Sequence, residues 1–252
     1  MLKPYTGSWT QAQSALRVWY ATGLGGELHA RVAARTEALL RDLYALHCLQ
    51  VGGTQRGVDL LAGRGLVHRI HVTGDGADGM RAAPAQLPLA SRSVDLVLLC
   101  HALEYCEDPH GLLREADRVL ALDGHLLIVG FNPWSLFGAR RLFGGRTIAW
   151  RGRFYSPTRI EDWFRLLGLR ACRCETVWMR PPTQHPGLRR HLAFMERAQR
   201  LAPACGGVYF LLARKQSIPL SPIQVGRQRN EPVRVPGTVQ PTQYGETQWR
   251  NR

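Results

Sequence analysis

The pattern of apolar and polar positions is clearest in the middle of the chain. Val94–Cys100 is apolar apart from Asp95, and its length suits a strand that is buried on both faces. After Asp108-Pro109, apolar residues recur at helical spacing, and Asp123-Gly124 is a stop signal for that helix. His125–Phe131 then has the pattern of a second buried strand. Strand, helix and strand within about 40 residues form a βαβ unit, so the sequence predicts an α/β protein.

The same criteria predict elements on both sides of this unit. We expect helices at Glu27–Leu43, Pro133–Phe143, Ser156–Leu167 and around Leu188–Leu201, and strands at Tyr44–Val51, Val67–Val72, Met80–Ala83, Ala171–Met179 and Val208–Ala213. Glycines at positions 23, 25 and 26 should separate a first helical stretch from the second. The chain therefore divides into an N-terminal helical segment (1–43), an α/β domain (44–215) and a basic, proline-rich tail (216–252) that we expect to be disordered.

Composition narrows the setting of this domain. No apolar run approaches the roughly 18 residues that span a bilayer, and residues 1–13 lack the apolar core of a secretory signal, so we expect a cytoplasmic protein. The six cysteines have no paired spacing typical of a metal site, which predicts no metal and reduced, buried thiols.

The net charge of +14 has several interpretations. The charge could attract nucleic acid, a membrane surface or an anionic substrate, or it could come from arginines spread over solvated faces without a binding role. The chain has neither a continuous basic run nor a basic–aromatic repeat, which disfavours nucleic acid as a partner. Nothing in the sequence indicates the oligomeric state.

Several short motifs in the central unit occur in the order found in one enzyme family. They are Leu87-Pro88-Leu89 before Ser93-Val94-Asp95, then Asp108-Pro109, Arg114-Glu115-Ala116-Asp117-Arg118-Val119-Leu120, Asp123-Gly124, and Phe131-Asn132-Pro133-Trp134-Ser135. In these motifs the chain resembles the class I S-adenosylmethionine-dependent methyltransferases, in the type 11 subgroup that methylates small molecules, and within it a poorly characterised bacterial branch. The resemblance implies a Rossmann-like fold with a mostly parallel seven-stranded sheet flanked by helices.

The resemblance also implies a cofactor, S-adenosylmethionine, at the carboxyl ends of the parallel strands. The family places an acid and a glycine-rich turn after its first strand, and this chain has Gln50 in place of the acid and a degenerate turn. The family's acid for adenine corresponds to Ala83, and near the ribose position only Asp75 occurs. Losing three carboxylate contacts, at about 1.5–3 kcal/mol each, would weaken binding severely unless backbone groups compensate. The expected cofactor residues are Gln50, Gly52, Gly53, Ala83, Pro84, Cys100 and His101.

His101 is the candidate catalytic residue, because a histidine titrates near neutrality and can act as a base. The alternative is a hydrogen-bonded histidine with a structural role. The segment Asn132–Arg146 follows the fifth strand and should lie at the mouth of the acceptor pocket. It would be a lid over an amphipathic or anionic acceptor, a helix on a membrane face, or an ordinary helix packed on the core. The expected acceptor contacts are Tyr105, Asn132, Trp134 and Arg140.

The sequence thus predicts methyl transfer from S-adenosylmethionine to a small-molecule acceptor. The missing acids leave a second hypothesis open, a catalytically inactive methyltransferase-like protein that serves as a binding or regulatory module. Nucleic-acid methylation is a third, and it is disfavoured because the chain has no N-P-P-Y type tetrapeptide after Cys100.

Overall fold

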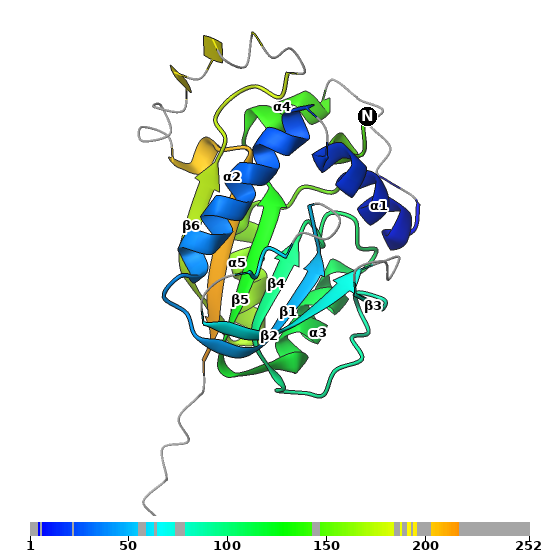
Figure 1. Ribbon diagram of the computed structural model, residues 1–252, viewed down its shortest axis with the longest axis vertical. Coiled ribbons are helices and arrows are strands. Elements are labelled where there is room, and N and C mark those ends of the chain that lie inside the picture. The colour runs from blue at the N-terminus through cyan, green and yellow to red at the C-terminus, as the bar shows by residue number, and fades with distance from the viewer. Residues whose placement is uncertain are drawn as a thin grey trace, which may run out of the picture. The chain divides into compact units, whose positions relative to one another are not determined.

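The predicted fold class is confirmed by a mixed sheet with helices on both faces (Figure 1). The computed structural model describes residues 5, 7–21, 23–54, 59–62, 65–73, 79–142, 147–183, 187, 191–192, 194–195 and 203–216. Within these ranges seven strands form one sheet in the order β3-β2-β1-β4-β5-β7-β6. Neighbouring strands are parallel except at β7, which is antiparallel to β5 and to β6.

The strands and helices have the following bounds. The strands are β1 (Ala45–Gly52), β2 (Leu66–Thr73), β3 (Met80–Arg81), β4 (Val94–Cys100), β5 (Leu120–Phe131), β6 (Leu169–Val177) and β7 (Val208–Lys215). The helices are α1 (Trp9–Tyr20), α2 (Gly23–Leu40), α3 (Pro109–Val119), α4 (Leu136–Leu142) and α5 (Pro157–Leu167), with short 3-10 turns at Ile148–Trp150 and Pro203–Cys205.

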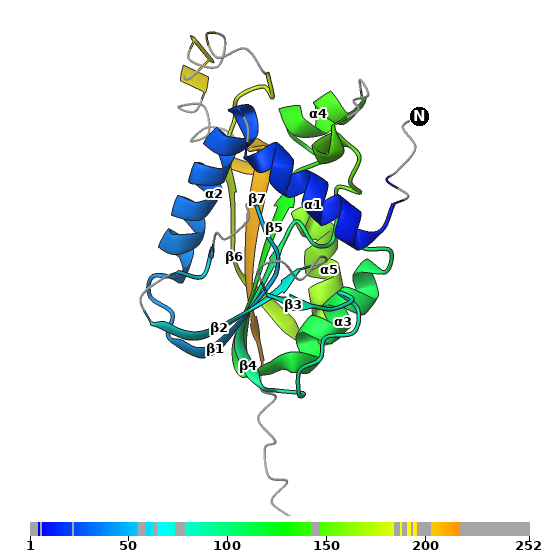
Figure 2. The ribbon, with the colours of Figure 1, turned by 45° about the vertical axis from the view of Figure 1, so that its right-hand side comes forward.

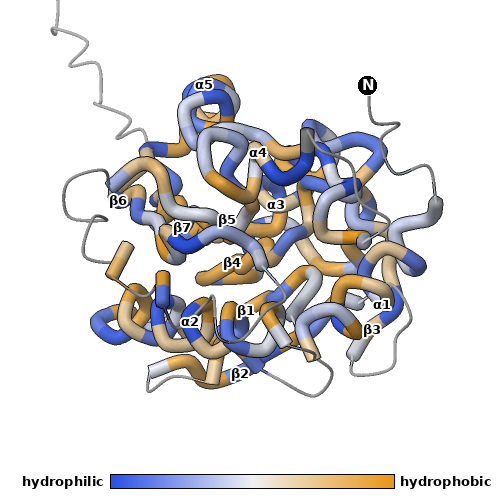
Figure 3. The backbone as a smooth tube through the Cα atoms, turned by 90° about the horizontal axis from the view of Figure 1, so that it is seen from above, coloured by the Kyte–Doolittle hydropathy of each residue, from blue (hydrophilic) through white to orange (hydrophobic). Residues whose placement is uncertain are grey.

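Each face of the sheet is covered by its own layer of helices (Figure 3). On one face, α1 and α2 pack their apolar stripes on Cys48, Leu98 and Val129. On the other, α3 and α5 pack on residues such as Leu99 and Leu211. The central strand β4 is apolar on both faces for this reason, as expected for a parallel strand in an α/β fold, whereas β2 and the edge strand β6 are partly exposed.

Helices also cover the carboxyl edge of the sheet, where a class I fold binds its ligands. Figure 2 shows α1 and α4 at this end, where the arrows of the parallel strands finish. Ser8 caps α1 through a capping box with Gln11, and this fixes where the helix begins. The first helical stretch of the chain therefore lies directly above the strand ends.

Most of the predicted elements are present, with shifted ends. The prediction that Asp123-Gly124 ends a helix is wrong, because α3 ends at Val119 and Leu120 is already extended and paired with Val94 in the sheet. The glycines at 23, 25 and 26 were expected to precede the second helix, but they form its first turn. A side chain at Gly25 would overlap the carbonyl oxygen of Trp19, so this glycine lets α2 approach α1 closely.

Two other predicted elements are present with different bounds, and some predictions lie outside the described residues. The inserted helix is shorter than predicted, Leu136–Leu142 rather than Pro133–Phe143, and β6 begins and ends two residues earlier than the predicted Ala171–Met179. Most of the helix expected around Leu188–Leu201, and all of the tail from residue 217, lie outside the described residues. In the part of the chain that is described, no helix is long and apolar enough to cross a membrane.

The cysteines are unpaired, but the prediction that they are buried holds for only half of them. Cys48, Cys100 and Cys106 are buried. Cys172, Cys174 and Cys205 are exposed, because β6 is an edge strand and the 3-10 turn at Pro203–Cys205 lies at the surface. No group of three or more potential metal ligands occurs among the described residues.

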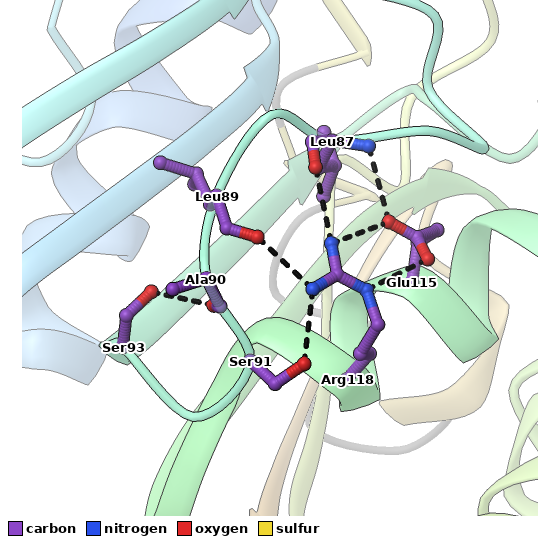
Figure 4. A network of polar contacts seen from close by, with 7 residues as sticks. All are labelled: Leu87, Leu89, Ala90, Ser91, Ser93, Glu115 and Arg118. Carbon is purple, nitrogen blue, oxygen red and sulfur yellow. Dashed lines mark hydrogen bonds and ion pairs between the residues drawn. The ribbon is translucent and has the colours of Figure 1, made fainter.

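One hydrogen-bond network accounts for several of the motif residues (Figure 4). The Arg118 guanidinium donates to the carbonyl oxygens of Leu87 and Leu89 and pairs with the Glu115 carboxylate, at 2.9–3.0 Å. Glu115 in turn accepts from the backbone N–H of Leu87 at 3.1 Å. These contacts of α3 hold the loop that leads into β4.

Candidate cofactor and acceptor site

The centre of the site is the turn at the end of β1. Gly52 pairs in register with Cys100, so the ends of β1 and β4 lie side by side. Gly52 has φ +78°, in the left-handed region that favours glycine, and a Cβ there would overlap the Cys100 carbonyl oxygen. Only glycine fits this position, because the Cys100 carbonyl oxygen occupies the space that a side chain would fill.

Gln50 uses its amide within the same turn. Its Oε1 accepts from the backbone N–H of Leu60 and its Nε2 donates to the carbonyl oxygen of Gly52, both at 3.1 Å. A carboxylate could not make the second bond because it has no hydrogen to donate. The glutamine that replaces the family's acid therefore closes the turn, with Gly53 packed beside it.

His101 follows Cys100 and lies in a fully buried network. Its Nδ1 donates to Glu104 Oε1 at 3.1 Å, and its Nε2 accepts from the Tyr20 hydroxyl at 2.6 Å. We assign this tautomer because Glu104 Oε1 already serves as the acceptor of a second hydrogen bond. Glu104 Oε1 also accepts from the backbone N–H of Phe131 at 2.8 Å. Burial raises the pKa of Tyr20 well above its ordinary value, so the hydroxyl is a neutral donor.

This arrangement bears on the two interpretations of His101. Both ring nitrogens are hydrogen-bonded, the ring stacks on Phe131 at 4.2 Å, and none of the side chain is exposed. The contacts join α1 to the end of β4. They favour the structural role, and a role in catalysis stays a prediction.

The helices contribute polar groups that the sequence patterns did not indicate. Gln13 on α1 is fully buried and donates from Nε2 to the carbonyl oxygen of His101 at 3.1 Å. Thr54, just after the turn, bonds through its hydroxyl to His29 Nδ1 on α2 at 2.6 Å. Burial lowers the pKa of His29. The sequence did contain one signal for these contacts. Gln13 and Arg17 lie in the apolar stripe of α1, where core residues are expected.

The remaining predicted cofactor residues lie at the same edge. Ala83 follows β3 and forms an isolated bridge with Gln86, and Pro84 between them is buried. Ala83 can offer only its backbone to an adenine ring. Asp75, the one acid near the expected ribose position, lies outside the described residues.

A cavity of about 660 Å³ opens beside α4. We call it the α4 cavity, and its lining residues are Pro133, Trp134, Ser135, Leu136, Gly138, Ala139, Arg141, Phe154, Met179, Met195 and Cys205. Trp134, expected as an acceptor contact, lines it and is 76% exposed. The charged residue in the lining is Arg141, where the sequence analysis expected Arg140.

Two other expected acceptor residues are buried and hydrogen-bonded to the backbone. Asn132 is buried, donates from Nδ2 to the carbonyl oxygens of Ala204 and Gly206, and accepts from the backbone of Trp134. Tyr105 is buried and donates its hydroxyl to the carbonyl of Ile148 at 3.1 Å. Neither lines the α4 cavity.

The comparisons with known proteins agree with this geometry. The model of a family described as a methyltransferase domain matches residues 41–128, which include β1 to β4, α3 and most of β5. The uncharacterised protein YafS of Escherichia coli K12 is 35% identical over 195 residues, covering 75% of this chain and 77% of that protein. The chain belongs to the class I S-adenosylmethionine-dependent methyltransferases.

Solved structures show the same fold at low sequence identity. A chain in the complex of the Haloferax volcanii Trm112 methyltransferase activator matches with a TM-score of 0.60 at 16% identity, covering 82% of this chain and 98% of that one. An S-adenosylmethionine-dependent methyltransferase of Thermotoga maritima matches with a TM-score of 0.53 at 15% identity, covering 82% and 93%. These structures confirm the fold, and the match to the methyltransferase-domain model confirms the predicted enzyme class and cofactor.

The residues of this methyltransferase fit the cofactor, although the family's acids are missing. Gly52 lets β1 and β4 end side by side at the carboxyl edge of the sheet. Gln13 Oε1 beside it is a buried acceptor with no hydrogen-bond partner among the described residues. A ligand that brings a donor to this turn would satisfy it. The described side chains beside this turn, Gln13 and Gln50, are neutral amides rather than carboxylates.

Proposed function

We propose that this methyltransferase transfers a methyl group from S-adenosylmethionine to a small molecule with an apolar body and an anionic group, bound in the α4 cavity. The observation that carries the proposal is the lining of the cavity, which is apolar and aromatic except for the Arg141 guanidinium and the Ser135 hydroxyl. Its volume of about 660 Å³ falls within the roughly 300–1,000 Å³ of small-molecule sites.

Each part of the lining has a separate effect on an acceptor. Trp134, Leu136 and Phe154 offer flat and branched apolar surface, while Met179 and Met195 adapt to irregular shapes. The Arg141 guanidinium lies 5.2 Å from the centre of the Phe154 ring, which holds the charge against the apolar wall. A carboxylate or phosphate could pair with this guanidinium in bidentate geometry.

The cavity is connected to the cofactor side of the domain by stacked aromatic rings. Phe154, in the cavity lining, stacks on Phe131 with ring centres 5.2 Å apart, and Phe131 stacks on His101 at 4.2 Å. Bound S-adenosylmethionine would supply an activated methyl group on a sulfonium. What the chain itself has to do is orient the acceptor and exclude water.

Binding of a matched pair of ligands tests the acceptor class. Decanoate and decanol share an apolar chain and differ in charge, and titration calorimetry measures their affinities for the full chain. We expect decanoate to bind about tenfold or more tightly, since a charged partner is worth about 1.5–3 kcal/mol. Arg141→Met should abolish this preference and leave decanol binding unchanged.

A second variant tests the location. Ala139→Trp places an indole in the α4 cavity and should abolish binding of both ligands and methyl transfer to any acceptor, while S-adenosylhomocysteine still binds. Leu166→Trp is the matched control, because Leu166 on α5 is 84% exposed and does not line the cavity. Equal binding of decanoate by wild type and by a folded Ala139→Trp variant would show that the cavity is not the acceptor site.

A further inference from the structure

Gln13 has an unusual position for a polar residue of α1. Its side chain is fully buried, and it contacts His101, a residue far away in the sequence that directly follows β4. Its Nε2 donates to the His101 carbonyl oxygen, which can only accept, and this settles the orientation of the amide. The opposite atom, Oε1, is then an acceptor without a partner among the described residues.

Oε1 faces the turn at Gly52. A Cβ built on Gly52 would lie 3.1 Å from Gln13 Oε1 and would overlap the carbonyl oxygen of Cys100. Two oxygen acceptors, one from Gln13 on α1 and one from Cys100 at the end of β4, thus meet beside Gly52. Buried acceptors are nearly always paired in folded proteins. An unpaired one at a binding turn indicates a donor that the ligand brings.

We propose that Gln13 Oε1 binds the α-ammonium of the methionine part of S-adenosylmethionine. In the family this group meets an acid at the position of Gln50. Here both ends of the Gln50 amide are hydrogen-bonded to Leu60 and Gly52, within the turn itself. The acceptor is supplied instead from α1, across the turn. Gln13 is a positioning residue, since it holds the cofactor and does not contact the methyl group that is transferred.

The inference depends on the cofactor of the family and not on the acceptor proposed above. The two can therefore fail separately. Loss of the ammonium contact changes cofactor affinity only, whereas the α4 cavity variants change acceptor affinity only.

A thermodynamic cycle on the ammonium group tests the inference without any turnover. Calorimetry would compare S-adenosylhomocysteine with S-adenosyl-4-thiobutyrate, which lacks only the α-amino group. We expect wild type to prefer the amine about tenfold to hundredfold, the range for a hydrogen bond to a charged group. In Gln13→Met, a substitution of similar volume, that preference should fall to within about twofold, with the affinity for the thiobutyrate analogue unchanged.

Two further variants keep the test decisive. Val18→Met introduces the same side chain on the exposed face of the same helix and should keep the full preference for the amine. If Gln13→Met does not fold, as judged by near-ultraviolet circular dichroism, Gln13→Asn replaces it, because it keeps the amide and withdraws it by one methylene. A preference that survives in a folded Gln13 variant overturns the proposal. So does a folded wild type that binds both ligands equally or neither of them.

Discussion

Replacing Gly52 by alanine would add one methyl group at the tightest point of the cofactor turn. Gly52 has φ +78°, and an L-residue in the left-handed region costs about 1–2 kcal/mol. The new Cβ would also overlap the Cys100 carbonyl oxygen, which pairing of β1 with β4 holds in place. Forcing an extra carbon into a packed site adds about 1–3 kcal/mol. We expect Gly52→Ala to lower the unfolding free energy by about 2–5 kcal/mol.

Gly168 provides a matched control for the backbone part of this loss. It caps α5 with φ +71°, and a Cβ built there has no described atom within 4 Å. Gly168→Ala should therefore cost only the left-handed strain of about 1–2 kcal/mol. Urea denaturation followed by circular dichroism measures both variants. S-adenosylhomocysteine titration should show at least tenfold weaker binding in Gly52→Ala and unchanged binding in Gly168→Ala.

The difference in unfolding free energy between Gly52→Ala and Gly168→Ala tests the reasoning. A loss of stability that is equal in both variants would mean that the turn has room for a side chain. The close approach of β1 and β4 described above would then be wrong. Normal cofactor binding by Gly52→Ala would refute the placement of the cofactor at this turn.

Two further predictions concern the networks behind the site. Tyr20→Phe removes the hydroxyl 2.6 Å from His101 Nε2 and leaves a fully buried nitrogen unpaired. Urea denaturation should therefore show an unfolding free energy lower by about 1–3 kcal/mol. An unchanged unfolding free energy would mean that this contact does not hold α1. Hydrogen bonding by Arg118 keeps the pKa of Glu115 below its ordinary 4.5, and a depressed carboxyl pKa contributes stability above the ordinary value that is lost as pH falls. The unfolding free energy should therefore decline below pH 4.5. Arg118→Leu should make that decline shallower and should raise the pKa of Glu115 in an NMR titration. An unchanged Glu115 pKa in this variant would contradict the network.

The central unit could be predicted because its determinants are local. Leu87, Glu115 and Arg118 lie within one βαβ unit, and their motif spacing reflects the hydrogen bonds that hold the loop before β4. The turn at Gly52 was also predictable, since a glycine after a buried strand needs no knowledge of distant parts. Both features follow from periodicity and from the allowed backbone conformations.

The polar groups around the turn could not be predicted in this way. Gln13 and Tyr20 contact His101 from far away in the chain, and no local pattern tells which strand end a helix will cover. The boundary between α3 and β5 was missed for a related reason. Leu120 pairs with Val94 in the sheet, so the helix ends before it. This tertiary contact outweighs the local signal at Asp123-Gly124, which predicted a later helix end.

These observations change how the missing acids are understood. In the family pattern, acid and glycines lie on one strand and the loop after it, so the sheet alone builds that part of the cofactor site. In this chain Gln50 is bound within the turn, and the unpaired acceptor comes from α1. The site is then complete only when α1 is docked, and the docking contacts are Tyr20 to His101 and Gln13 to the His101 backbone. The histidine that the sequence suggests as a base thus has a second explanation, because it is the residue that holds the helix in place.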